Sequence, residues 1–338
     1  MQRCLELAAM GLGQVSPNPM VGCVIVCDEK IVAEGYHQQY GQPHAEPNAI
    51  MQISDDVLQK STLYVTLEPC SHFGKTPPCT DLIINKKIPR VVVGNLDSNP
   101  LVSGKGIQKL KDAGIQVEYG VLNKECKELN KRFFAYHEKK RPYIILKWAQ
   151  TNDGYISKLP IPENKQDNWI SSLESKQLVH QWRSQEQSIL IGYNTALTDN
   201  PQLTTRLTEG KNPIRLVLDK KLELPSTINV FNVESKTIVF NATTNDIKNN
   251  IVYIKIDFKN LIHEITHQCF LQNISSIIVE GGAKTINHFI EKGVWDEARI
   301  FINPNLNFAT GVKAPVLSSI YKLSECVGND LLIIYKNT

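Results

Sequence analysis

Apolar and polar positions alternate in short blocks along the first 140 residues of the chain. Apolar residues at helical spacing over the first dozen positions predict an amphipathic helix. Two apolar runs, at 21–26 and 31–36, flank the polar turn 28–30 and predict a β-hairpin. This mixture of helical and strand patterns is typical of an α/β sandwich. Further helices are expected at 45–53, 80–85, 106–113 and 123–140, and further strands at 63–67, 90–93 and 115–119.

A second series of the same kind begins at Tyr143. A charged stretch at 138–142 precedes it and ends in proline, so we expect two domains, 1–141 and 142–338. The Asn-rich segment 241–250 is expected to form an exposed loop. The strands of this half are numerous enough for a separate sheet. They are expected at 143–146, 214–218, 237–240, 251–254, 277–279, 298–302 and 331–335, with helices at 172–185, 261–271 and 285–291.

The composition narrows the class of protein and its partners. With 338 residues, the chain is long enough for two domains of ordinary size. The 37 basic and 34 acidic side chains leave a net charge of +3, too small for non-specific binding of nucleic acid or a membrane. No apolar run approaches the ~18 residues of a membrane helix, and the first dozen residues lack the apolar centre of a signal peptide. We therefore expect a cytoplasmic protein that acts on small molecules.

Most candidate metal ligands and catalytic residues of the first half lie in short motifs that include two of the eight cysteines. His44-Ala45-Glu46 is followed, after one predicted strand, by Cys70 and then by Cys79. One imidazole and two thiolates suit tetrahedral zinc and leave the fourth position for water, as in a catalytic site. Glu46, two residues after the histidine, can face that water as a general acid and base without binding the metal. The arrangement matches the His-x-Glu and Pro-Cys pattern of zinc nucleobase deaminases, except that eight residues separate the cysteines instead of two.

Two other interpretations of these residues stay open. A structural zinc site would need a fourth protein ligand, for which His72 is the nearby candidate, and the cysteines could also be unrelated buried thiols. The presence of Glu46 beside His44 favours the catalytic interpretation. In the second half, Gly281 and Gly282 lie between a predicted strand and a predicted helix, where backbone N–H groups can receive a phosphate. The same pair could form only a tight turn, and the glycine fingerprint of a Rossmann domain is missing.

Longer motifs in both halves resemble the bifunctional riboflavin-biosynthesis deaminase–reductase family. In the first half these are Pro-Asn-Pro-Met-Val-Gly at 17–22, His-Ala-Glu at 44–46 and the loop Cys-Ser-His-Phe-Gly-Lys-Thr-Pro-Pro-Cys at 70–79. In the second half, 147–154 and 192–206 are similar to the family's reductase motifs. The resemblance covers nearly the whole chain. It implies a cytidine-deaminase-like three-layer αβα domain followed by an α/β domain like dihydrofolate reductase.

The resemblance also implies two reactions and the residues that serve them. The first is zinc-dependent hydrolytic deamination of a diaminopyrimidinone that carries ribose 5-phosphate, and the second reduces the ribosyl group to ribitol with NADPH. For deamination it implies zinc on His44, Cys70 and Cys79, proton transfer by Glu46, and substrate contacts from Asn18, His37, His72 and Lys75. For reduction, the resemblance implies that the residues near NADPH are Ala149, Trp169, Thr195, Asp199 and Gly282. It implies that the residues near substrate are Asp167, Arg183, Leu203, Arg206 and Glu280. Lys147 is a candidate for contact with NADPH or with substrate, and we count it among the substrate contacts.

Two competing hypotheses differ from this one in function class. The chain could be a deaminase of another nucleobase joined to a reductase-like binding module without reductase activity. It could also be a zinc scaffold without catalysis, in which case replacing Glu46 would change no turnover. The family forms homo-oligomers, so a dimer or tetramer is expected here, although no interface is visible in the sequence.

Overall fold

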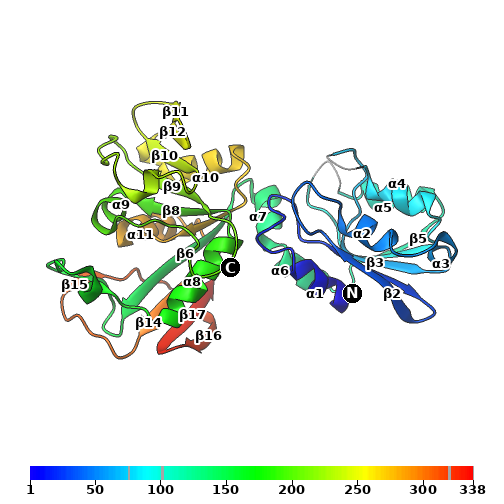
Figure 1. Cartoon of the computed structure of the whole chain (residues 1–338), viewed down its shortest axis with the longest axis horizontal. Coiled ribbons are helices and arrows are strands. Elements are labelled where there is room, and N and C mark those ends of the chain that lie inside the picture. The colour runs from blue at the N-terminus through cyan, green and yellow to red at the C-terminus, as the bar shows by residue number, and fades with distance from the viewer. Residues whose placement is uncertain (75–76, 100–102, 319–320, 338) are drawn as a thin grey trace. The chain divides into compact units, whose positions relative to one another are not determined.

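A computed structural model describes residues 1–74, 77–99, 103–318 and 321–337 of the chain. The chain divides into two compact units, Met1–Lys140 and Arg141–Thr338 (Figure 1). Each unit has its own buried apolar core around its own sheet. Among the described residues, no helix combines the length and the apolar character needed to cross a membrane.

The first unit has three layers. Its sheet has the order β2-β1-β3-β4-β5, with β1 antiparallel to β2 and β3, and β3, β4 and β5 parallel. Alternate residues of β1 point to opposite faces: Ile25 packs in a core with α2, α4 and α5, whereas Val24 packs against α1. The elements are α1 Gln2–Ala9, β1 Gly22–Cys27, β2 Lys30–Tyr36, α2 Ala45–Ile50, α3 Asp55–Leu58, β3 Thr62–Leu67, α4 Cys79–Asn85, β4 Arg90–Asn95, α5 Lys105–Asp112, β5 Gln116–Tyr119, α6 Asn123–Leu129 and α7 Lys131–Lys139.

Two predicted helices of this unit are shorter than expected. The expected helix at 123–140 is interrupted at Asn130, whose side chain accepts the N–H of Met20 and donates to its carbonyl, both at 2.8 Å. This pair of bonds satisfies a buried turn at Met20, and it ties the break between α6 and α7 to the first part of the chain. The expected helix at 45–53 ends at Ile50.

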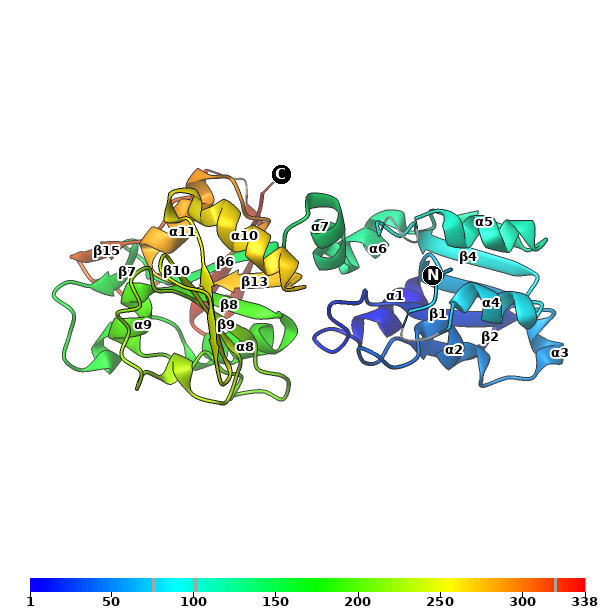
Figure 2. The same ribbon diagram turned by 90° about the horizontal axis from the view of Figure 1, so that it is seen from above.

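The second unit is built on a ten-stranded sheet of order β11-β12-β10-β9-β8-β13-β6-β14-β17-β16. Its seven inner strands, from β12 to β14, are parallel, and antiparallel strands complete both edges. Helices α10 and α11 cover one face and α8 the other (Figure 2). The elements are β6 Tyr143–Thr151, β7 Tyr155–Lys158, η1 Lys165–Asn168, α8 Leu173–Gln185, β8 Ser188–Gly192, α9 Tyr193–Asp199, β9 Ile214–Leu218, η2 Asn229–Phe231, β10 Thr237–Asn241, β11 Asp246–Lys248, β12 Ile251–Lys255, η3 Phe258–Asn260, α10 Leu261–Leu271, β13 Ser276–Val279, α11 Ala283–Glu291, β14 Glu297–Asn303, β15 Gly311–Lys313, β16 Tyr321–Val327 and β17 Asp330–Lys336.

The α/β class expected for both halves is confirmed, and the sheet of the second unit is larger than expected. All seven predicted strands of that unit are present. Strand β8 in the centre of the sheet was not predicted, nor were β7, β11, β15 and β16. The expected loop at 241–250 is exposed over most of its length but contains β11, which pairs with β12.

Candidate functional site

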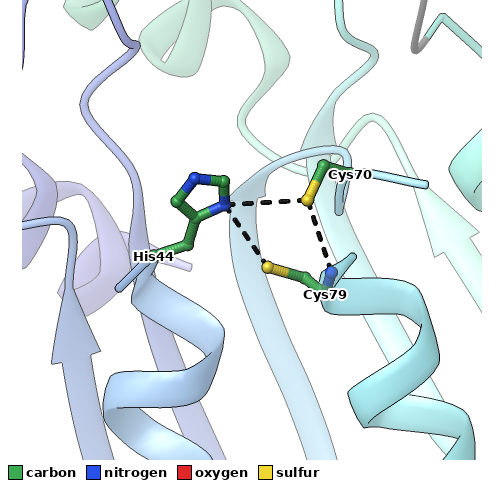
Figure 3. A group of neighbouring side chains, drawn as sticks. All are labelled: His44, Cys70 and Cys79. Atoms are coloured by element: carbon green, nitrogen blue, oxygen red, sulfur yellow. Dashed lines mark hydrogen bonds between the residues drawn. The ribbon is translucent and has the colours of Figure 1, made fainter. Parts of the chain in front are cut away.

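Three metal-ligand side chains converge at the carboxyl end of β3. His44 is the N-cap of α2, Cys70 lies just beyond β3 and Cys79 is the first residue of α4 (Figure 3). The Nδ1 atom of His44 lies 3.6 Å from Sγ of Cys70 and 3.4 Å from Sγ of Cys79. The three ligand atoms all lie within 4.8 Å of one another, and this is the one such group of three among the described residues. Two sulfurs and one imidazole nitrogen at this separation fit a tetrahedral zinc ion with one position open.

The electrostatics of the cluster favour metal binding. Hydrogen bonds with Cys79 and His44 lower the pKa of the Cys70 thiol to about 4, so one of the two sulfurs is a thiolate near neutral pH. The N–H of Cys79, in the first turn of α4, also points at Sγ of Cys70 at 3.3 Å. A thiolate is the form that binds zinc, so the hydrogen bonds around Cys70 favour the form of this side chain that can be a ligand.

Glu46 lies in the first turn of α2, beside the cluster. Its side chain is 3% exposed, and its Oε2 atom has no hydrogen-bond partner among the described residues. Burial raises the pKa of the Glu46 carboxyl to about 7. A buried carboxyl group with an unsatisfied oxygen is unusual in a folded protein and indicates a ligand or a transferred proton.

A second buried carboxylate, Glu68, belongs to the same region and is fully satisfied. Its Oε1 accepts the N–H groups of Gly106 and Ile107, and its Oε2 accepts those of Asp97 and Gly104. Glu68 therefore holds the start of α5 and the loop before it. The sequence motif Glu-Pro-Cys shows only that a carboxylate precedes Cys70, so this structural role was not predicted.

The remaining predicted deaminase residues fall into two groups. Asn18 and His37 are joined, since Nδ2 of Asn18 lies 3.2 Å from Nε2 of His37, and the His37 ring packs edge-on to His44 with centroids 5.2 Å apart. His72 is exposed on the loop between the two cysteines. Lys75 lies outside the described residues. The structure thus brings Asn18 and His37 to the cluster, whereas His72 is exposed on the loop between the two cysteines.

A long cleft forms the second site, in the Arg141–Thr338 unit. It consists of two adjoining cavities of about 770 and 520 Å³ that share wall residues including Lys147, Trp169, Asp199 and Glu280. Ala149, Thr195 and Gly282 line the larger cavity, and Arg183, Leu203 and Arg206 line the smaller one. Asp167 is exposed on η1 and belongs to neither wall. Ten of the eleven predicted reductase residues therefore meet in one cleft.

Buried charges stand where the two cavities meet. Arg183 and Glu280 form an ion pair at 2.9 Å, with 12% and 10% of their side chains exposed. Burial alone would raise the pKa of Glu280, but the charges of Arg183 and Lys147 lower it to about 2. Burial lowers the pKa of Lys147, against the attraction of Glu280. Such a desolvated cation between an anion and a cleft is suited to moving a proton.

At the start of α11, the wall of the larger cavity includes a glycine, Gly282, which has no side chain. A Cβ on Gly281 would lie 2.7 Å from Cα of Ile191, and Gly282 has a φ of 55°, which disfavours other residues. Gly281 is therefore required by its close packing against β8, and Gly282 lines the cavity at the positive end of the nine-residue helix α11. A helix start of this kind can receive an anionic group such as a phosphate.

The cleft residues that the sequence did not single out include His180 and Lys220. His180 lines the smaller cavity, and its Nδ1 accepts the N–H of Arg206 at 3.0 Å. Lys220 lines the larger cavity just beyond β9. A lone histidine in a helix and one lysine of a Lys-Lys pair carry no pattern that singles them out, so only the fold reveals them.

The fold and these two sites define a zinc-binding deaminase region followed by a reductase domain, and comparisons with known proteins agree. Residues 1–95 match the family described as the cytidine and deoxycytidylate deaminase zinc-binding region, and residues 142–311 match the RibD C-terminal domain. The riboflavin biosynthesis protein RibD of Aquifex aeolicus is 41% identical over 99% of this chain and 97% of its own length. RibD of Escherichia coli is 35% identical over 96% of this chain and 92% of its own.

A solved structure extends the similarity to three dimensions. The diaminohydroxyphosphoribosylaminopyrimidine deaminase/5-amino-6-(5-phosphoribosylamino)uracil reductase of Thermotoga maritima is 37% identical, with a TM-score of 0.89 over 100% of this chain and 97% of that one. The chain belongs to the RibD family of bifunctional riboflavin-biosynthesis deaminase/reductases.

Proposed function

We propose that this chain catalyses two consecutive steps with two substrates of the same pathway. Residues 1–141 deaminate 2,5-diamino-6-ribosylamino-4(3H)-pyrimidinone 5′-phosphate with zinc, and residues 142–338 reduce the ribosyl group of 5-amino-6-(5-phosphoribosylamino)uracil to ribityl with NADPH, both in the cytoplasm. The observation that carries the proposal is the unsatisfied Oε2 of Glu46 beside a three-ligand metal cluster, in a chain whose second unit holds a charged cleft. A homo-oligomer stays a prediction.

In the deamination, the chain's own residues hold and move protons. Zinc on His44, Cys70 and Cys79 supplies Lewis acidity that makes water nucleophilic. Glu46 accepts a proton from the attacking water at Oε2 and later donates it to the departing amine, so that one carboxyl serves both steps. Burial raises the pKa of this carboxyl, which favours its acting as a proton acceptor and donor in turn. Substrate contacts are assigned to Asn18, His37, His72 and Lys75.

In the reduction, NADPH supplies the hydride, and the ring opening of the ribosylamine needs a proton. Glu280 stays ionised because of its low pKa and its pairing with Arg183, so Lys147 and Asp199 are the candidates for proton transfer. Ala149, Trp169, Thr195 and Gly282 are assigned to NADPH. Substrate contacts are assigned to Arg183, Leu203, Arg206 and Glu280, with Arg183 and Arg206 offering positive charge to the substrate's phosphate. A contact from Asp167 stays a prediction, because this residue lies outside both cavity walls.

The experiment that tests this proposal follows ammonia release and NADPH absorbance in one tube, with and without a chelator. With the diamino substrate, the intact protein should release ammonia and then consume NADPH, and chelator should stop both. With the deaminated intermediate, NADPH consumption should continue in the presence of chelator. Ammonia release without NADPH consumption would instead favour a deaminase joined to a module without reductase activity, and zinc binding without either reaction would favour a scaffold.

A further inference from the structure

Two histidines lie one turn apart on the exposed side of α10. His263 and His267 are both exposed, and their rings lie nearly parallel, at an angle of 13° and with centroids 6.0 Å apart. Four residues along an α-helix correspond to a rise of about 6 Å and a rotation of about 40°, so both side chains project from the same side of the helix. The pair belongs neither to the metal cluster of the first unit nor to the walls of the cleft.

The opposite side of α10 is anchored in the apolar core of the second unit. Ile262, Ile265 and Cys269 are buried there. Within the helix, Oγ1 of Thr266 donates to the carbonyl of Ile262 or of His263, both at 3.0 Å. Because the packing of α10 fixes its backbone, a ligand that joins the two histidines meets ligand atoms whose spacing is already set.

A carboxylate lies beside the first histidine. Nδ1 of His263 is 4.0 Å from Oε1 of Glu264, the next residue of the helix. Metal-binding histidines commonly direct one ring nitrogen at a carboxylate, which orients the ring and leaves the other nitrogen to bind the metal. In His263 the nitrogen on the far side from Glu264 is Nε2, so this atom is the candidate ligand.

The sequence of this turn, His-Glu-Ile-Thr-His at 263–267, has the form of the helical zinc motif of metallopeptidases. A catalytic zinc site of that kind needs a third protein ligand, with the glutamate acting on the bound water. Among the described residues, no histidine, cysteine or carboxylate joins this pair in a group of three potential ligands. Glu264 lines a hollow with Lys255 and Lys259 instead. The pair can therefore hold a cation through two nitrogens but is not arranged for peptide hydrolysis.

We propose that His263 and His267 form a second metal site, a chelate of two imidazoles for a divalent transition cation such as Cu²⁺, Ni²⁺ or Zn²⁺. Imidazole nitrogen suits these ions, whereas Mg²⁺ and Ca²⁺ prefer oxygen ligands. Water occupies the remaining positions. Because the histidines are held one turn apart only in the folded chain, the bound ion joins two turns of α10 and stabilises the second unit. The inference does not depend on the two proposed reactions.

The test titrates Ni²⁺ into the full-length, zinc-loaded protein by calorimetry, with zinc content measured before and after by atomic absorption. Ni²⁺ is the probe because, unlike Cu²⁺, it does not oxidise thiols. We expect one Ni²⁺ to bind per chain without loss of zinc and to raise the Tm of the second unit. For His263→Ala and for His267→Ala, Ni²⁺ should bind at least about tenfold more weakly, because one imidazole alone forms no chelate.

The matched control moves one histidine without changing the composition. When His267→Gln is combined with Gln268→His, the imidazoles lie five positions apart, about 140° around the helix. This double variant should bind Ni²⁺ as weakly as His267→Ala. Equal Ni²⁺ affinity in the unmodified protein and these variants, or no binding by the unmodified protein, would overturn the inference. Release of zinc in step with Ni²⁺ uptake would also overturn it, since the ion would then replace zinc at the cysteines.

Discussion

At the scale of single residues, two buried carboxylates of the first unit show how surroundings set a role. Glu46 and Glu68 are 3% and 4% exposed. The two oxygens of Glu68 accept four backbone N–H groups, whereas Oε2 of Glu46 has no hydrogen-bond partner in the part of the chain that the structure describes. The first arrangement stabilises the fold, and the second leaves a carboxyl group available for chemistry.

Glu46→Gln should abolish deamination without harming the fold. The amide has nearly the same volume but cannot carry a proton between water and amine, so the rate of ammonia release should fall by about 10² to 10⁴ or more. The zinc content, measured by atomic absorption, should stay at the level of the unmodified protein, because Glu46 is not one of the three clustered ligands. Turnover at an unchanged rate would instead support the scaffold hypothesis.

Glu68→Gln should destabilise the fold of the first unit, whereas Glu46→Gln should affect turnover and not the fold. An amide keeps one oxygen and presents an N–H₂ group to one pair of backbone donors, either Gly106 and Ile107 or Asp97 and Gly104, which leaves two N–H groups without an acceptor. A loss of about 2 kcal/mol should lower the Tm of the first unit by about 5 °C in a calorimetric scan. If Tm is unaffected and only turnover falls, the structural role assigned to Glu68 is wrong.

At the scale of elements, the segment after α9 is held in place by side chains from two others. Arg215 of β9, which is fully buried, donates from Nε to the carbonyl of Gln202 at 2.9 Å. From α8, His180 accepts the N–H of Arg206, and Arg183 donates to the carbonyl of Thr204 at 3.4 Å. The loop that carries two predicted substrate contacts is therefore preorganised before substrate binds.

Replacing His180 should change substrate binding through this loop. His180→Ala leaves the N–H of Arg206 without its acceptor, and we expect KM for the deaminated substrate to rise about tenfold, with NADPH affinity unchanged. His180→Asn offers an amide oxygen in place of Nδ1 and should restore most of the affinity. Equal losses of substrate and NADPH binding in both variants would indicate general misfolding of the cleft.

The same contact predicts a pH dependence. Burial, together with Arg183, Arg206 and Lys176, lowers the pKa of His180 to about 4, with Glu280 acting against them. Neutral imidazole accepts at Nδ1 and imidazolium cannot, so the contact is present above this pKa and lost as pH falls through it. The stability it contributes is complete above pH 6.5 and declines below that value. KM measured from pH 7 to pH 4.5 should begin to rise at the acid end, and His180→Asn should show no such rise.

Elements also show where sequence patterns stop being informative. Strand β8 is only five residues, Ser-Ile-Leu-Ile-Gly, and follows α8 after two polar residues. So short an apolar run fits the end of a helix as well as a buried strand. Only its pairing with β9 and β13 in the structure shows that it is a strand. The break at Asn130 is equally invisible, since its cause is a contact with Met20 110 positions away.

At the scale of the whole molecule, the two sites differ in how far the sequence predicts them. The metal cluster comes from two short motifs within 36 positions, and its residue types, one histidine and two cysteines, by themselves indicate zinc binding. The cleft collects single residues from β6, α8, α9 and the loops beyond β9 and β13. Their proposed roles follow from family resemblance. No sequence pattern singles out His180, and only the fold shows its contact with the N–H of Arg206.

The described residues of each site nevertheless come from one unit: the cluster residues lie in Met1–Lys140 and the cleft residues in Arg141–Thr338. Single substitutions should therefore silence one reaction and spare the other. Lys147→Ala removes a buried cation of the cleft, and NADPH oxidation with the deaminated substrate should fall by about 10² or more. Ammonia release from the diamino substrate should keep its rate.

Glu46→Gln provides the reciprocal measurement, in which NADPH oxidation with the deaminated substrate should be unchanged. Both variants are assayed as full-length, zinc-loaded protein, so that zinc content and chain length are the same in each comparison. A fall in ammonia release caused by Lys147→Ala, at unchanged zinc content, would show that the cleft contributes to the first reaction. Because no cluster residue lies beyond Lys140 and no described cleft residue lies before Arg141, the structure predicts that each substitution affects its own reaction alone.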